Sequence, residues 1–196
     1  MTNRVLPRFS RGHVTIMFSS RKSKYPMYLE SHAEYAVALQ LELDSSVDSF
    51  GSQPFTFEYA VNGKQRMYTP DFLVYRGGRK IYLEIKSAEF ASSSSLIRHY
   101  DALIQMFAEQ DLVLQLTFMD FNSIQVRNSK LLARYVSLDS SCLFTITKQY
   151  QGKIVDLQDH SSDWATLLSL VYAAMSQGKI FYDTSELISL DTEVQW

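Results

Sequence analysis

The stretch that decides the fold is YTPDFLVYRGGRKIYLEIKS, residues 68–87. Two runs rich in apolar and aromatic residues flank a Gly77-Gly78 pair, which is typical of two antiparallel strands joined by a tight turn. The sequence therefore predicts a β-hairpin. Asp71, Glu84 and Lys86 interrupt its otherwise apolar pattern and need an explanation.

Side chains alternate between the two faces of a strand, so the second strand of this hairpin has two different faces. We expect Glu84 and Lys86 to share one face, beside Asp71, while the alternate residues face the core: Ile81, Leu83 and Ile85. Two interpretations follow. The carboxylates could hold a hard divalent ion while Lys86 acts on a water or a phosphate, or a Glu–Lys pair could simply lie on a wet surface.

The segments around the hairpin predict a mixed sheet with helices packed on it, an α/β arrangement. The spacing of apolar residues predicts helices at 27–44 and 95–110. Strands are expected at 54–61, 65–75, 80–87 and 112–120. After residue 128 the pattern changes to helices at 128–138 and 161–178, a short strand at 179–183 and a last helical turn within 184–196. Helices with a short strand are typical of a winged-helix module, so we predict domains at 1–128 and 129–196.

Charge is distributed unevenly along the 196 residues, although the net charge is only −2. No acidic residue precedes Glu30, while this leader carries six basic residues: Arg4, Arg8, Arg11, Arg21, Lys22 and Lys24. A basic arm suits phosphate contacts with DNA, although a merely solvated leader would look the same. The region from residue 142 has three basic and seven acidic residues, a balance that favours docking of a protein over DNA.

Composition excludes several classes of protein. The only cysteine is Cys142, so no internal disulfide or cysteine-based zinc site is expected. No apolar run approaches the length of a membrane span, and no glycine-rich phosphate loop is present. We expect a protein of the bacterial cytoplasm that does not itself hydrolyse nucleotides.

The order Pro-Asp, hairpin, Glu-x-Lys resembles the PD-(D/E)xK nuclease superfamily. In its wider context, LESHAEYAVALQLELD, VDSFGSQP, YTPDFLV and LEIK resemble TnsA, the endonuclease subunit of heteromeric cut-and-paste transposons. The later RNSKLLARY and GKIFYDTSELISLDTEV are also similar to that family. The resemblance implies a restriction-endonuclease-like fold.

The resemblance also implies the site. Catalytic roles fall on Glu34, Asp71, Glu84 and Lys86, and the metal ligands would be Glu34, Asp71, Glu84 and the main-chain carbonyl of Ile85. Accessory positions are Gln53, from the QP element, and Glu30, which lies one turn before Glu34. The cofactor would be Mg²⁺ or Mn²⁺.

What the TnsA family does supplies the expected function. The chain would cut the 5′ ends of a transposon in double-stranded DNA, beside a TnsB-type transposase and a TnsC-type AAA+ ATPase that docks on the C-terminal module. Two alternatives share parts of the pattern. One is a stand-alone restriction or repair nuclease, and the other is a catalytically silent DNA- or protein-binding module.

Overall fold

The computed structural model describes residues 15–61 and 63–196, which form two compact units that meet between Phe121 and Asn122. Three of the predicted DNA-binding residues lie outside the described residues: Arg4, Arg8 and Arg11. The domain boundary predicted after residue 128 falls inside α3, Ile124–Leu132. A helix is one hydrogen-bonded element, and the units accordingly separate before α3 begins.

The first unit is built on a mixed four-stranded sheet in the order β3-β6-β7-β8. Its strands are β3 (Val47–Ser52), β6 (Phe72–Arg76), β7 (Arg79–Ser87) and β8 (Val113–Met119). The pairs β3–β6 and β6–β7 are antiparallel, whereas β7 and β8 are parallel and therefore need a crossover connection. The short helix η1 (Ala88–Phe90) and α2 (Ser94–Ala108) provide it. The predicted mixed α/β arrangement is confirmed.

The hairpin that was expected to decide the fold is β6–β7, at the centre of this sheet. Gly77 and Gly78 have φ of 53° and 77°, the left-handed values that a two-residue hairpin turn of type I′ requires at both positions. The turn fixes the register in which Phe72 faces Leu83 and Arg76 faces Arg79. This register decides which residues meet at the far end of the hairpin.

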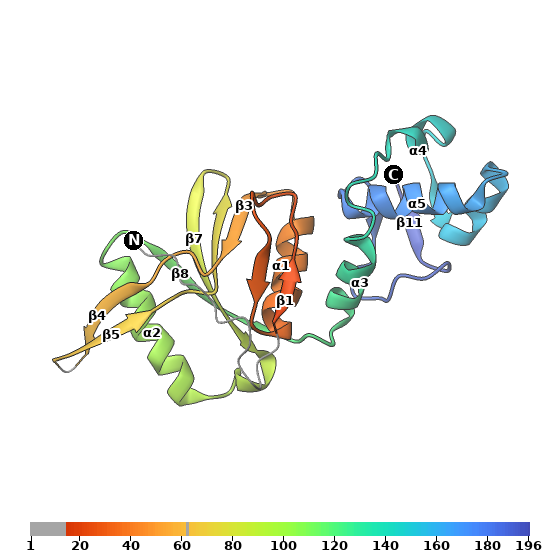
Figure 1. Ribbon diagram of the computed structural model, residues 1–196. Coiled ribbons are helices and arrows are strands. Elements are labelled where there is room, and N and C mark those ends of the chain that lie inside the picture. The colour runs from red at the N-terminus through yellow and green to blue at the C-terminus, as the bar shows by residue number, and fades with distance from the viewer. Residues whose placement is uncertain (1–14, 62) are drawn as a thin grey trace. The chain divides into compact units, whose positions relative to one another are not determined.

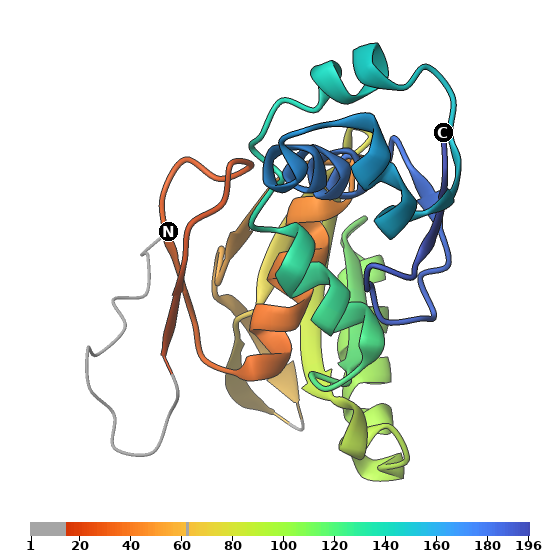
Figure 2. The same cartoon turned by 90° about the vertical axis from the view of Figure 1, so that its right-hand side faces the viewer.

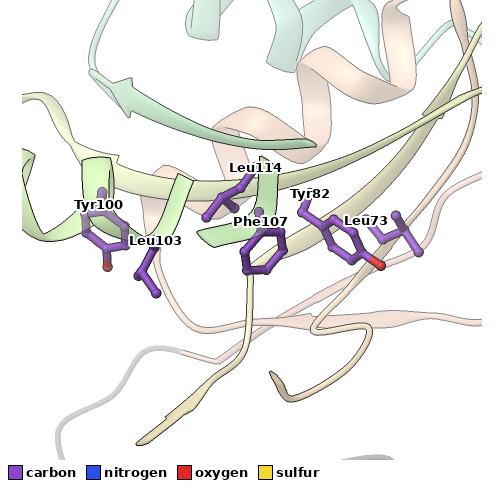
Figure 3. Packing of buried hydrophobic residues seen from close by; sticks show 6 residues of the cluster. All are labelled: Leu73, Tyr82, Tyr100, Leu103, Phe107 and Leu114. Atoms are coloured by element: carbon purple, nitrogen blue, oxygen red, sulfur yellow. The ribbon is translucent and has the colours of Figure 1, made fainter. Parts of the chain in front are cut away.

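Helices cover both faces of the sheet (Figure 1). On one face lies α1 (His32–Leu43), in orange at the front of the sheet in Figure 2. It buries Ala33, Val37 and Leu41, as its helical spacing predicted. On the other face, α2 packs on a cluster drawn in Figure 3: Leu73, Tyr82, Tyr100, Leu103, Phe107 and Leu114.

The sequence left two interpretations of the face that carries Glu84, a metal site or a solvent-exposed surface. The second interpretation is wrong. Tyr82 and Glu84 are 2% and 4% exposed, as buried as Leu83 and Ile85 beside them. The physical reason is that α2 and the aromatic residues of the hairpin formed by β4 (Phe57–Val61) and β5 (Lys64–Tyr68) pack over this face. Alternation correctly predicted two faces, but both of them are core.

Two small antiparallel pairs complete the first unit, namely β1 (Ile16–Phe18) with β2 (Met27–Leu29), and β4 (Phe57–Val61) with β5 (Lys64–Tyr68). The single strand predicted at 65–75 is therefore two strands in two sheets. Pro70 lies buried at the break, where it has no N–H to give to a ladder. Likewise β2 precedes α1 where a continuous helix from residue 27 was predicted.

The second unit combines helices with a three-stranded antiparallel sheet in the order β10-β11-β9. Its elements are α3, α4 (Ser141–Ile146), β9 (Gln151–Lys153), η2 (Ile154–His160), α5 (Trp164–Ser176), β10 (Phe181–Tyr182) and β11 (Glu193–Gln195). The predicted stop of the long helix is confirmed, since Gly178 follows α5 with φ of 68°. The helical turn expected within 184–196 is wrong, because this segment supplies β11. In the described part of the chain, no helix has the length and apolar character needed to cross a bilayer.

Candidate active site

The far end of the β6–β7 hairpin brings Asp71 next to the Glu84–Lys86 segment. Asp71 directly precedes β6, and the pairing of Phe72 with Leu83 brings it close to Glu84. Its carboxylate accepts a hydrogen bond of 2.7 Å, through Oδ2, from the backbone N–H of Ile85.

Asp71, Glu84, Lys86 and Glu34 form the polar cluster of the candidate site, and Glu84 accepts the most hydrogen bonds among them. Its Oε1 accepts hydrogen bonds of 2.6 Å from both the Lys86 ammonium and the Tyr100 hydroxyl. Its Oε2 accepts a third, of 2.8 Å, from the Tyr68 hydroxyl. Burial of a carboxylate is tolerated only with such partners, and here one of them is a cation.

Glu34 reaches the same region from the first turn of α1. Ser31 caps the helix by accepting from the N–H of Glu34, and the Glu34 carboxylate accepts in return from the Ser31 hydroxyl at 2.8 Å. Its other oxygen accepts from the backbone N–H of Glu30 at 2.9 Å. This reciprocal arrangement is a variant of the capping box and holds a carboxylate that is only 6% exposed.

The pKa values of two carboxyl groups in the cluster, Asp71 and Glu34, are raised. Burial, together with repulsion from Glu84 and Glu34, raises the pKa of Asp71 to about 8. Burial also raises the pKa of Glu34, although the hydrogen bonds from Glu30 and Ser31 oppose this. The cluster therefore carries more negative charge than its one ammonium group balances.

Lys86 is held in its charged form. Burial lowers the pKa of its ammonium, but the hydrogen bond and the attraction from Glu84 outweigh burial and raise it. The ammonium also lies 5.4 Å from the centre of the Tyr100 ring, a cation–π contact. In the structure Lys86 is therefore a fixed positive charge and not a free base.

A divalent cation fits this cluster in part. Carboxylate oxygens are the ligands that hard cations take. Burial first, and then repulsion from Glu84 and Glu34, raise the pKa of Asp71, and a bound cation would oppose both causes. Yet within residues 15–61 and 63–196, no three acidic, histidine or cysteine side chains are gathered as a ready-made metal site. Asp71 and Glu34 fit best, since the oxygens of Glu84 already accept from three side chains.

The two accessory positions border the cluster through their backbones. Gln53 follows β3 with φ of 46°, an unusual value for a residue other than glycine, and its N–H donates to the Asp71 carbonyl at 2.8 Å. Strained backbone of this kind is found preferentially at functional sites. Glu30 contributes its N–H to Glu34, as described above.

The described part of the basic arm packs on the protein itself. The Arg21 guanidinium forms a salt bridge of 3.0 Å with the buried Glu42, near the C-terminal end of α1. The Lys22 ammonium donates to the carbonyl of Leu41 at 2.9 Å. Lys24 lies 5.3 Å from the centre of the Tyr25 ring. Arg21 and Lys22 therefore have a structural role at the end of the helix that the charge count did not predict.

Three residues of the cluster were not predicted: Tyr68, Tyr100 and Ser31. A signal existed for Ser31, because Ser-x-x-Glu before an apolar helix is the sequence pattern of a capping box. Tyr68 stands immediately before Thr-Pro-Asp, but tyrosine in a strand is ordinary. No local pattern could indicate Tyr100, because only the crossover through α2 brings it to Glu84.

Part of the chain is similar to a known protein family. None of the curated proteins that were compared with the chain matches it. Residues 44–134 match the family model described as TnsA-like endonuclease N terminal. The matched segment contains Asp71, Glu84 and Lys86, begins after Glu34 and ends after α3. In this segment the chain is therefore similar to the N-terminal domain of TnsA-like endonucleases.

Proposed function

We propose that this chain is the endonuclease subunit of a heteromeric cut-and-paste transposase, and that it hydrolyses the 5′ strands at the transposon ends. The observation that carries the proposal is the cluster of Asp71, Glu84, Lys86 and Glu34, three of which lie in the segment that matches the TnsA-like family. Carboxylates that can bind a divalent cation, with a lysine ammonium beside them, suit metal-assisted hydrolysis of a phosphodiester.

In this proposal Asp71 and Glu34 hold Mg²⁺ or Mn²⁺, with the Ile85 carbonyl and Glu84 as the remaining predicted ligands. The bound cation supplies Lewis-acid stabilisation of the charge on the phosphate and lowers the pKa of a water. Lys86 provides a second, fixed positive charge for the same phosphate. Gln53 borders the site through the Asp71 carbonyl and would orient Asp71 from the backbone side.

We also propose that the second unit is a winged-helix-like module that docks the TnsC-type ATPase. Support comes from its composition of helices and a small three-stranded sheet, and from a groove of about 650 Å³ beside β10 and β11. Phe181 and Leu187 line this groove and are 75% and 50% exposed. Four acidic residues line the same groove: Asp183, Glu186, Asp191 and Glu193. Acidic and apolar side chains in one groove favour a partner segment that carries basic and apolar residues.

The direct test uses the complete chain with its TnsB-type and TnsC-type partners on DNA that carries a transposon end. Mapping of the cut strands should show 5′ cleavage that requires Mg²⁺ and is lost with Asp71→Asn. Cleavage by the chain alone would instead identify a stand-alone nuclease. Binding of divalent ions without any cutting, under all partner combinations, would contradict the proposal.

A second test measures the products of transposition, namely simple insertions and cointegrates. If the chain cuts only 5′ strands, Lys86→Ala leaves the TnsB-type partner able to cut and join the 3′ strands. The element would stay attached to its donor, and replication would turn simple insertions into cointegrates. Long-read sequencing of the insertion junctions distinguishes these outcomes. Simple insertions at the wild-type proportion would contradict a role of Lys86 in 5′ cleavage.

Docking is tested separately from cleavage. Phe181→Ser should weaken association with the ATPase at least tenfold, because the side chain at the centre of an interface carries much of its binding energy. Leu138→Ser is the matched control, since Leu138 is 41% exposed in the same unit but does not line the groove. Equal effects of the two substitutions would place the docking surface elsewhere.

A further inference from the structure

Glu84 is the centre of a hydrogen-bonded group whose other members are Lys86, Tyr68 and Tyr100. Two donors reach Oε1 at 2.6 Å and one reaches Oε2 at 2.8 Å. A carboxylate offers about four acceptor positions, two on each oxygen. Oε1 is therefore saturated, and a cation at Oε1 would displace either the ammonium or the Tyr100 hydroxyl. Oε2 has one position left, so a cation there would have to share this oxygen with the Tyr68 hydroxyl.

The two tyrosines are themselves fixed by the core. Tyr100 belongs to the cluster on the α2 face and is 9% exposed. The Tyr68 ring meets the Phe107 ring edge-on, with 5.8 Å between centres. Figure 3 shows Tyr100 and Phe107 within this packing. Rings held in this way place their hydroxyl groups with little freedom, so the oxygens of Glu84 are fixed from two directions.

A lysine needs such fixing more than other residues do. Its ammonium is a point charge on a flexible four-carbon stem, and a displacement of about 1 Å at a reacting centre can cost about 100-fold in rate. Glu84 and the Tyr100 ring together restrain the Lys86 ammonium, at 2.6 Å and 5.4 Å respectively. Truncation of either tyrosine hydroxyl would loosen this restraint without removing any charge.

We infer that Glu84 is a positioning residue for Lys86 and not a ligand of the cation, and that Tyr68 and Tyr100 hold Glu84 in place. This inference rests on the proposed nuclease function and divides the cluster into two parts. Asp71 and Glu34 face the cation, whereas Glu84, its two tyrosines and Lys86 form a second group that places one positive charge. Sequence motif alone assigns Glu84 to the first part.

Titration of the complete chain with Mn²⁺, followed by calorimetry, separates a ligand from a positioning residue without any turnover. Glu84→Gln keeps an oxygen that accepts from Lys86 and Tyr100, and its NH2 group can donate to the Tyr68 hydroxyl, which then accepts. If Glu84 is not a ligand, the affinity for Mn²⁺ should therefore change less than about threefold. Asp71→Asn is the matched control and should weaken binding at least tenfold. A loss with Glu84→Gln as large as that with Asp71→Asn would overturn the inference.

A double-mutant cycle tests whether the tyrosines act through Lys86. Tyr100→Phe should slow strand cleavage about tenfold in the wild-type background, and should slow the residual cleavage that remains in the Lys86→Ala background less than twofold. Tyr75→Phe, on the exposed end of β6, should have no effect in either background. Equal slowing by Tyr100→Phe with and without Lys86 would show a structural role only, and would refute the assignment.

The inference and the proposed function fail in different ways. If the wild-type complex does not cut DNA, the proposed function fails, and the cycle is measured on thermal unfolding with Tyr100→Phe and Glu84→Gln. Coupling between these two substitutions supports the hydrogen-bonded group, and additive effects refute it. If the complex cuts but Mn²⁺ affinity depends on Glu84, only the inference fails.

Discussion

Asp71→Asn should make the protein more stable at alkaline pH while it abolishes cleavage. The pKa of Asp71 is raised from an ordinary 3.8 to about 8, because burial and two neighbouring carboxylates oppose its charge. Folding therefore has to hold an unfavourable carboxylate above pH 8. Asparagine has similar size, still accepts from the Ile85 N–H, and carries no charge.

The sign of the pH dependence follows from the raised pKa. Below about pH 4 the carboxyl is protonated in both the folded and the unfolded state. The free energy of unfolding then carries no penalty from a buried carboxylate. Stability is lost as the pH rises through about 8, where the folded-state carboxyl ionises. The advantage of asparagine should consequently be near zero at pH 4 and reach its full size above pH 8.

The size of the effect can be bounded. A shift of about 4 pKa units at about 1.4 kcal/mol per unit gives an upper limit of about 6 kcal/mol. Relaxation of the protein and entry of water reduce the cost of a buried carboxylate, since buried charges in proteins behave as though the effective dielectric constant were about 20. We expect about 2–3 kcal/mol, or roughly 10 °C in the unfolding temperature of a unit of this size.

The assay is thermal unfolding of the complete chain in EDTA at several pH values, followed by circular dichroism. Both tryptophans, Trp164 and Trp196, lie in the second unit, so their fluorescence gives an internal control that should not shift. Asp101→Asn, at an exposed position of α2, is the control for loss of one charge. Excess Mg²⁺ at pH 8.5 should stabilise the wild type and not Asp71→Asn. An Asn variant that is no more stable than wild type at pH 9 would refute the reasoning.

Three further predictions concern other parts of the chain. Replacing Arg4, Arg8 and Arg11 with alanine should reduce the slope of log affinity for DNA against log salt by about 3, and an unchanged slope would exclude them as phosphate contacts. Gly178→Ala should destabilise the second unit by about 1 kcal/mol, seen in tryptophan fluorescence, because its φ is 68°. Lys22→Met should lower the stability of the first unit by about 1–2 kcal/mol, since the ammonium donates to carbonyls at the end of α1; no change would contradict that role.

The centre of the fold could be predicted from local patterns. The Gly77-Gly78 turn, the alternating strands on either side and the helical spacing of α1 and α2 each depend on neighbours in the sequence. The strands β1, β3, β9 and β11 were missed. Three of them, β1, β9 and β11, have only three residues each, which carry too little periodicity to distinguish a strand from a loop. The fourth, β3, has the sequence VDSFGS, whose aspartate, serines and glycine are typical of a turn. Pairing with distant partners creates these strands, and pairing is invisible in a single sequence.

The site divides in the same way. The motif placed Asp71, Glu84 and Lys86 together, since one hairpin determines their register. The burial of Glu84 could not be predicted, because it depends on α2 packing over a face that alternation marks as polar. The partners Tyr68 and Tyr100 come from a separate small sheet and from the crossover helix, so their roles follow only from the folded arrangement.

The position of helix α1 along its axis sets the distance between Glu34 and Asp71. Glu34 stands in its first turn, and Glu42 in its last turn is locked by Ser20 and Arg21. Each residue of slippage along the axis would carry Glu34 about 1.5 Å away from Asp71. A substitution at Glu42, about two helical turns from Glu34, would therefore change the distance between the Glu34 and Asp71 carboxylates. Arg21 and Lys22 therefore help to fix the distance between two carboxylates at the other end of the helix.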